Sequence, residues 1–139
     1  MTFLVDTHIF IDLLQGNEKR FSKEAKNIFR NASNQFLVSV VCLWEISIKY
    51  ALGKLELVKP PDAWLLDTVQ KIGWQTLSIG PLHALAVSSL PFHHKDPFDR
   101  LLIAQAKTLR LGSAGQEVEA VEREIAREGG FAGAGIAND

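Results

Sequence analysis

Three acidic residues stand where apolar segments of this sequence begin or end. Asp6 closes the apolar run at residues 3–5, Glu45 follows the strand-like run at residues 36–39, and Asp99 opens an apolar helical segment. Burying a carboxylate is costly unless it is paired or bound to a metal ion. Three such carboxylates therefore indicate one shared Mg²⁺ or Mn²⁺ ion, since these hard cations take oxygen ligands. A site of this kind predicts phosphate chemistry.

Each of these acids also has a purely structural interpretation. Asp6 is suited to capping the helix that follows it, and Glu45 would lie at the surface if it faced outward from its helix. Asp99 in a first helical turn would interact favourably with the helix dipole. Asp96 is a good N-cap, because Pro97 fits the first helical position.

Four cations lie close in the sequence to the acidic positions: Lys49, Lys54, Lys95 and Arg100. Lys49 follows Glu45 by one helical turn, and Arg100 is next to Asp99. Any of these side chains would be able to bind a backbone phosphate, but a solvated surface charge is the favoured interpretation of each except Arg100. His93 and His94 are adjacent and have no cysteine or histidine cluster around them, which disfavours a zinc site.

The elements that must position these residues alternate along the chain. Strands are expected at residues 3–5, 36–39 and 74–79. Helices are expected at residues 7–14, after Ser22, at 40–52, 63–72 and 81–90, and from Asp96 through Leu109. This alternation predicts an α/β fold with a mostly parallel sheet, in which ligands gather at the carboxyl ends of the strands.

Composition limits the classes of protein that this chain can represent. Its 139 residues predict one domain, and 47% hydrophobic and 22% charged residues are ordinary for a globular protein. Cys42 is the single cysteine and lies in an apolar run, which predicts a buried, inert thiol. Neither a signal peptide nor a membrane span is readable, so we expect a cytoplasmic protein without membrane contact.

Charge is unevenly distributed along the chain. Residues 1–111 contain 13 Lys and Arg against 10 Asp and Glu, whereas residues 112–139 contain 2 against 6. If a metal ion neutralised the three site acids, the first part would present a basic exterior suited to a polyanion. An ordinary mixed surface explains the same counts.

Several motifs together resemble a PIN domain. They are Leu-Val-Asp-Thr-His at residues 4–8, Trp-Glu-Ile-Ser-Ile-Lys at 44–49, Gly-Lys-Leu at 53–55, Leu-Pro-Phe-His-His at 90–94 and Asp-Pro-Phe-Asp-Arg at 96–100. More narrowly, they resemble the VapC-type toxins of bacterial toxin–antitoxin pairs. The resemblance covers residues 1–111 and implies a small, mostly parallel central sheet flanked by helices.

The resemblance also implies a function. It implies an endoribonuclease that needs Mg²⁺ or Mn²⁺ and cuts RNA, often tRNA or rRNA, together with a cognate antitoxin partner and a homodimer. The acids of the family fall on Asp6, Glu45 and Asp99. Thr7 matches a position that supports the first acid, and Asp96 matches a recurrent acid of the subgroup, whose role we leave open.

The chain departs from the family pattern after Leu111. In place of a short apolar strand and a fourth acid, Ser113 and Gln116 resemble a capping box, and Val118 begins a helical spacing of apolar residues. We therefore expect residues 112–139 to form an atypical acidic helix and a flexible Gly/Ala-rich tail. Glu117 lies near the position of the fourth acid, but no strand is readable there to aim it.

Two other functions remain open at this point. In the first, the altered C-terminal segment has cost catalysis, and a PIN-like binding module still holds antitoxin or RNA. In the second, Asp6 at a strand end is the nucleophile of an aspartyl-phosphate enzyme. The second is disfavoured, because a second Asp two residues later and a supporting lysine motif are not evident.

Overall fold

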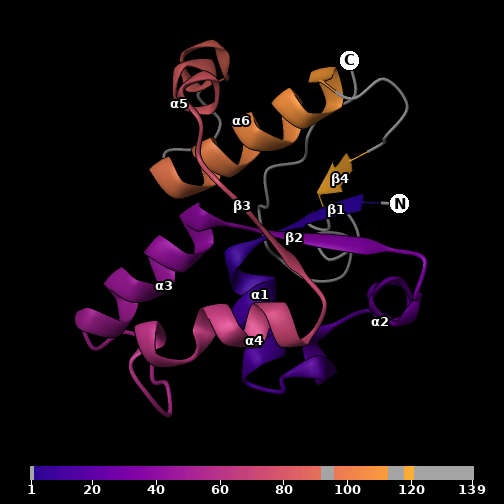
Figure 1. Cartoon of the computed structure of the whole chain (residues 1–139), viewed down its shortest axis with the longest axis vertical. Helices are drawn as coiled ribbons and strands as arrows, with labels where there is room; N and C mark the ends of the chain where they lie inside the picture. The colour runs from indigo at the N-terminus through magenta and orange to yellow at the C-terminus, as the bar shows by residue number, and fades with distance from the viewer. Residues whose placement is uncertain (1, 92–95, 113–117, 121–139) are drawn as a thin grey trace.

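A computed structural model of the chain describes residues 2–91, 96–112 and 118–120. Its centre is a parallel sheet of four strands in the order β3-β2-β1-β4 (Figure 1). The strands are β1 (Thr2–Val5), β2 (Gln35–Ser39), β3 (Gln75–Leu77) and β4 (Val118–Ala120). The predicted α/β class with a parallel sheet is confirmed.

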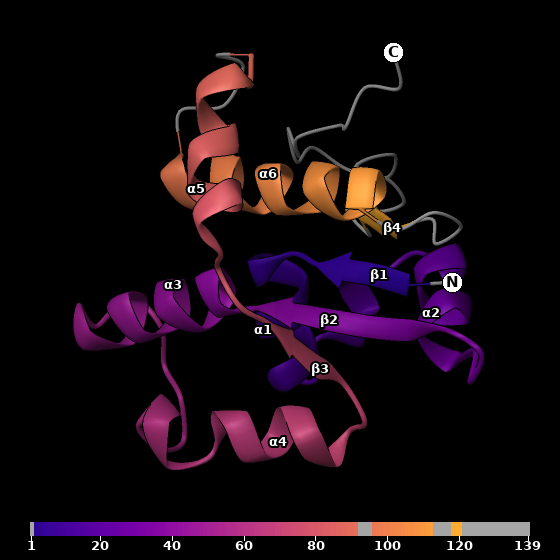
Figure 2. The ribbon, with the colours of Figure 1, turned by 45° about the horizontal axis from the view of Figure 1, so that its top comes forward.

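Helices connect the strands and cover both faces of the sheet. They are α1 (Thr7–Leu14), α2 (Lys23–Arg30), α3 (Val40–Ala51), α4 (Leu65–Lys71), α5 (Pro81–Ala86) and α6 (Pro97–Gly112), with short 3₁₀ turns at Glu18–Arg20, Pro61–Ala63 and Val87–Ser89. Helices α5 and α6 lie on one side of the sheet and α4 on the other, while α3 extends beyond the carboxyl end of β2 (Figure 2).

Local capping chemistry starts the helices where the sequence predicts. The Asp6 carboxylate caps α1, and the Ser22 hydroxyl accepts a hydrogen bond from the Ala25 N–H at 2.9 Å at the start of α2. Asp96 Oδ1 accepts from the Phe98 N–H at 2.8 Å at the start of α6. Gly53 has a φ of 71°, a conformation that glycine adopts without strain, and it ends α3.

The core lies on both sides of the sheet and is rich in aromatic rings. Phe29, Phe36 and Trp74 stack with centroid separations of 5.0 to 6.0 Å, and Phe3 stacks on Phe36 at 5.7 Å. Val5 and Val38, which pair across β1 and β2, are completely buried. This packing sets the carboxyl ends of β1 and β2 level with each other.

Two predicted helices are shorter than their sequence patterns suggest. The segment at 63–72 divides into a 3₁₀ turn and α4, because Trp64 leaves helical geometry with a φ of −151°. Its indole N–H donates to the Lys59 carbonyl at 3.1 Å. The segment at 81–90 ends as α5 at Ala86 and continues as a 3₁₀ turn before Pro91.

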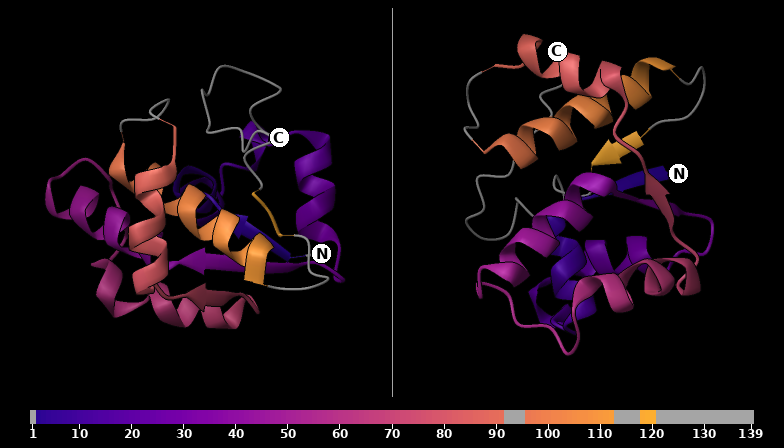
Figure 3. Two further views of the ribbon diagram at one scale, coloured as in Figure 1. Left: turned by 90° about the horizontal axis from the view of Figure 1, so that it is seen from above. Right: turned by 60° about the vertical axis from the view of Figure 1, so that its left-hand side comes forward.

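The prediction of a helix from Ser113 is wrong at Val118–Ala120, which form β4. Thr2 pairs with Val118 and Leu4 with Ala120, in parallel (Figure 3). The unpaired edge of β1 supplies backbone hydrogen-bonding groups, and satisfying them outweighs the weak helical preference of three residues. The sheet therefore has the strand beside β1 that the sequence did not reveal.

Several predictions fall on residues outside the described part. They concern His93 and His94, Glu117, and the rest of the predicted acidic helix and Gly/Ala-rich tail. Within the described residues, no helix combines the length and the apolar character needed to cross a membrane.

Candidate active site

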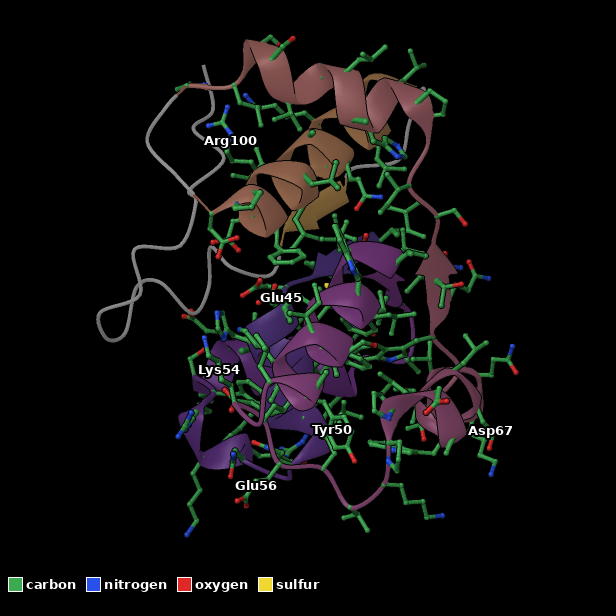
Figure 4. The ribbon with its side chains drawn as sticks, turned by 90° about the vertical axis from the view of Figure 1, so that its left-hand side faces the viewer. Glu45, Tyr50, Lys54, Glu56, Asp67 and Arg100 are labelled. Atoms are coloured by element: carbon green, nitrogen blue, oxygen red, sulfur yellow. The ribbon has the colours of Figure 1, made fainter. Side chains whose placement is uncertain are left out.

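The three predicted acids come from three elements that meet at the carboxyl ends of β1 and β2. Asp6 directly follows β1, Glu45 lies in α3, and Asp99 lies in the first turn of α6. Helix α3 packs against both α1 and α6. Figure 4 shows Glu45 on α3 where this helix approaches α6.

Asp6 is buried and caps its helix. Its Oδ1 accepts a hydrogen bond from the Thr7 N–H at 2.7 Å. The structural interpretation of Asp6 is therefore correct, yet it does not conflict with metal binding, because a carboxylate offers about four lone-pair positions. Thr7 is completely buried beside the Cys42 thiol.

Glu45 and Thr7 each have a buried side-chain oxygen without a hydrogen-bond partner among the described residues. The Glu45 side chain is buried, and its Oε2 forms an ion pair with Lys49 Nζ at 2.7 Å. Its Oε1 is also buried and has no hydrogen-bond partner among the described residues. Leaving a buried charged oxygen unpaired is expensive, so this atom needs a ligand such as a metal ion or an ordered water.

Asp99 experiences the charge of its neighbours. Burial, together with the negative charges of Asp96, Asp6 and Glu45, raises the pKa of this carboxyl to about 6, while His8 acts in the opposite direction. Like charges that crowd one site disfavour ionisation. The carboxylates are thus close enough to repel one another, and a cation among them would relieve that repulsion.

Cys42 is a buried neighbour of the acids. Burial raises the pKa of its thiol to about 12, and the charges of Asp6 and Glu45 contribute to the rise. Its Sγ donates to the Val5 carbonyl at 3.6 Å. Because a thiolate is the reactive form, the inert thiol predicted from the sequence agrees with this environment.

Asp96 and Arg100 have structural contacts at the start of α6. Asp96 is exposed and caps the helix. The Arg100 guanidinium donates to the carbonyls of Val87 at 3.1 Å and Pro91 at 3.0 Å, which ties α6 to the turn after α5. Figure 4 shows it away from Glu45. The guanidinium N–H groups of Arg100 therefore already hold α6 against the turn after α5. A phosphate contact by Arg100 stays a prediction.

The sequence did not reveal a buried polar connection behind the site. Ser39 Oγ donates to Gln105 Oε1 at 2.5 Å and accepts from the Val41 N–H at 3.0 Å. Gln105 Nε2 donates to the Ser78 carbonyl at 3.3 Å. Gln105 is completely buried, and these bonds hold the first turn of α3 against α6. The sequence signal for this connection was Gln105 itself, which is a polar residue within the otherwise apolar segment at 101–106.

The carboxylate oxygens of Asp6, Glu45 and Asp99 are the type of ligand that a hard divalent cation prefers. In this structure they do not converge on one position. Among the described residues, no three His, Cys, Asp or Glu side chains lie close enough together to hold a metal ion as they stand. Mg²⁺ usually keeps several waters and binds one or two carboxylates together with substrate phosphates. The unpartnered Glu45 Oε1 and the mutual repulsion around Asp99 suit a metal held in that way.

The chain combines a parallel sheet with carboxylates at the carboxyl ends of its strands. Comparison with known proteins identifies the protein family that has this arrangement. The family model described as the PIN domain matches residues 3–113, so the chain belongs to the PIN-domain family. Ribonuclease VapC16 from Mycobacterium tuberculosis (strain ATCC 25618 / H37Rv) is 33% identical over 60 residues. That match covers 43% of this chain and only 43% of the relative.

A solved structure has the same fold. The crystal structure of VapBC2 from Rickettsia felis bound to a DNA fragment from their promoter superposes with a TM-score of 0.53 at 13% sequence identity. The superposition covers 86% of this chain and 98% of that chain. The resemblance to PIN domains and VapC-type proteins predicted from the motifs is confirmed.

Proposed function

We propose that this chain is an endoribonuclease that hydrolyses RNA phosphodiester bonds with Mg²⁺ or Mn²⁺ held by Asp6, Glu45 and Asp99. The observation that carries the proposal is the buried Glu45 Oε1, which has no hydrogen-bond partner among residues 2–91, 96–112 and 118–120 and lies at the carboxyl end of a PIN-family sheet. Similarity to a protein named Ribonuclease VapC16 supports RNA as the substrate.

Each acid would have a distinct part in this chemistry. A divalent cation bound here would lower the pKa of an attacking water and offset charge on the phosphate oxygens. Asp6 holds its carboxylate in place through the cap of α1, and Glu45 directs one oxygen to Lys49 and presents the other. Asp99 would supply the third carboxylate, and a bound cation would keep it ionised, although its pKa is raised to about 6 when no cation is bound.

We further propose that the nuclease is the toxin of a toxin–antitoxin pair. Its partners would be an RNA such as tRNA or rRNA, a cognate antitoxin and a second copy of the chain, in the cytoplasm. The support is the resemblance to VapC-type toxins and the fold shared with VapBC2. A PIN-like unit at residues 1–111 followed by an atypical segment at 112–139 stays part of the proposal, with Val118–Ala120 added to the sheet.

One observation favours the alternative of a catalytically impaired binding module. The Lys49 ammonium already occupies one oxygen of Glu45, so a metal ion would have to share or displace it. In that case the chain would bind RNA or antitoxin without cleaving RNA. Another reason for this alternative came from the sequence, in which no strand was readable after Leu111. That reason is weaker, because Val118–Ala120 form β4.

Cleavage of total bacterial RNA by the purified protein distinguishes the two functions. With Mg²⁺ or Mn²⁺ we expect discrete fragments that disappear in EDTA. Asp99→Asn and Glu45→Gln should each reduce the rate at least ~100-fold, as expected for loss of a group that moves protons or holds the metal. Asp67→Asn is the matched control, since Asp67 is an exposed carboxylate paired with Lys71. A folded protein that binds RNA but yields no fragments would establish the binding module.

A further inference from the structure

Trp44 exposes a large aromatic surface next to the candidate site. Its side chain is 55% exposed, and it is the only aromatic residue among the large exposed apolar side chains of the described segments. Trp64 and Trp74, in contrast, are partly buried against the core. Exposing an indole to water forfeits the free energy of burying it, so Trp44 is a candidate for contact with a ligand.

The indole of Trp44 is held in place on one side. It packs edge-to-face against Phe98, with ring centroids 5.1 Å apart and planes at 74°. Trp44 comes from α3 and Phe98 from α6, so the pair joins the two helices that carry Glu45 and Asp99. Each ring directly precedes one of these acids in the chain. The aromatic pair therefore joins α3 and α6 one residue before each acid, and part of the indole is open to solvent.

We propose that Trp44 is a stacking platform for an unpaired RNA base adjacent to the phosphate bound at the carboxylates. This inference rests on the proposed function and names a feature of its substrate. Single-stranded RNA is commonly recognised by stacking of splayed bases on aromatic side chains, and stacking tolerates sequence because every base has a π-face. A base held in a duplex would not reach the indole, so the site should prefer single-stranded segments and loops.

A nucleic-acid base fits Trp44 better than a protein partner for a positional reason. The phosphate would lie at Asp6, Glu45 and Asp99, and the base of a neighbouring nucleotide must then lie beside those residues. The pair formed by Trp44 and Phe98 lies on the same two helices as two of these acids. A preorganised indole also loses little conformational freedom when a base stacks on it.

The test measures binding of a short single-stranded RNA of mixed sequence in the Asp99→Asn background, where the RNA should stay uncut. Trp44→Leu keeps an apolar side chain but removes the aromatic face, and it should weaken binding about 5- to 140-fold. Trp44→Phe keeps a face and should stay within a few-fold of the parent. Leu52→Ala is the control, because Leu52 is an exposed apolar residue at the far end of α3.

A second measurement alters the RNA instead of the protein, so the binding losses measured with the unaltered Trp44 do not depend on how Trp44→Leu folds. The same RNA is prepared with one abasic nucleotide at each position in turn. Removal of one particular base should weaken binding to the parent and add nothing to the loss caused by Trp44→Leu. The quenching of tryptophan fluorescence on binding should be reduced for that same abasic RNA.

The outcomes separate the stacking inference from the proposed function. Binding that is equal in the parent and Trp44→Leu, or insensitive to every abasic position, would overturn the stacking role while leaving RNA binding intact. Loss of self-association in Trp44→Leu, with RNA affinity unchanged, would instead assign Trp44 to an interface between copies. Absence of RNA binding in every variant would overturn both the stacking role and the nuclease.

Discussion

The ion pair between Glu45 and Lys49 involves only one of the two carboxylate oxygens of Glu45. Lys49 Nζ lies 2.7 Å from Glu45 Oε2, while the other oxygen of Glu45 is buried and has no hydrogen-bond partner in the described part of the chain. In the metal-free protein, Lys49 therefore compensates only part of the buried charge. A metal ion would supply the missing compensation, so the importance of Lys49 to stability should depend on whether metal is bound.

Replacing Lys49 tests this dependence. Lys49→Met should lower the free energy of unfolding in EDTA by ~1–3 kcal/mol, because it leaves a buried carboxylate without its cation. Saturating Mg²⁺ should recover most of that loss. Urea unfolding measures both values. Lys71→Met is the control, since Lys71 and Asp67 form an exposed pair of the same spacing, and its removal should change stability by less than ~0.5 kcal/mol. An equal loss with and without Mg²⁺ would argue against metal binding at Glu45.

Asp99 predicts a pH dependence whose sign follows from its raised pKa. In the metal-free protein its carboxyl has a pKa of about 6, against a value of 3.8 for the unperturbed group. The folded state thus binds this proton more tightly than the unfolded state does. The stabilisation is fully present below about pH 4 and is lost as the pH rises through about 6.

Unfolding in EDTA from pH 4 to 7 measures this effect. The parent should lose stability from Asp99 over that range, whereas Asp99→Asn should show a flatter profile and be more stable than the parent above pH 6. Metal should bind the parent more tightly as the pH rises, because protons compete for the same oxygens. Asp67→Asn should keep the slope of the parent. Superimposable profiles for the parent and Asp99→Asn would contradict the raised pKa.

At the scale of elements, Gln105 couples the two helices that bear Glu45 and Asp99. It is completely buried in α6, accepts from Ser39 at the start of α3 and donates to the Ser78 carbonyl after β3. Buried polar groups of this kind define one arrangement of the packed elements, provided that all members are satisfied. The position of Asp99 relative to Glu45 should therefore depend on Gln105.

Gln105→Leu should lower the free energy of unfolding by ~1–3 kcal/mol, because the Ser39 hydroxyl loses its buried acceptor. It should also reduce RNA cleavage, since α6 is then free to shift relative to α3. Thermal unfolding and cleavage rates measure the two effects. Gln70→Leu, at an exposed position of α4, should change stability by less than ~0.5 kcal/mol. Full activity with reduced stability would show that Gln105 contributes to folding but does not position the acids.

For the whole molecule, the partner of β1 comes from the far end of the described chain. Strand β4 extends the sheet beyond β1, opposite to the side where β2 pairs. Without it, β1 would be an edge strand with unpaired backbone groups next to Asp6. The short segment at 118–120 thus supports the strand that positions the first acid.

Two shortened chains test the contribution of β4. A chain that ends at residue 112 should be less stable than one that ends at residue 120 by ~1–3 kcal/mol, since it loses the backbone hydrogen bonds of the β1–β4 pair. Urea unfolding of both chains under identical conditions measures the difference. Equal stabilities would mean that Val118–Ala120 do not hold the sheet together.

The local chemistry of the sequence determined most of the helices and strands. It also determined where the elements next to Asp6 and Asp99 begin or end. The bounds of α1 agree with the apolar spacing of residues 7–14, and Ser22 and Asp96 cap the helices that follow them. These features depend on neighbours within one helical turn or along one strand, so residue types and spacing were enough. The positions of Asp6 and Asp99 at element ends followed from the same local signals.

Only the tertiary structure decided the pairings between distant residues. Val118–Ala120 form a strand because the edge of β1, more than a hundred residues earlier, offers hydrogen-bonding groups. Gln105 is buried because Ser39 and Ser78 meet it there, and Arg100 donates to carbonyls of a turn that no local pattern places. Such contacts depend on how the elements pack. Their free energies can override a local helical preference that is worth only a few tenths of a kcal/mol for each residue.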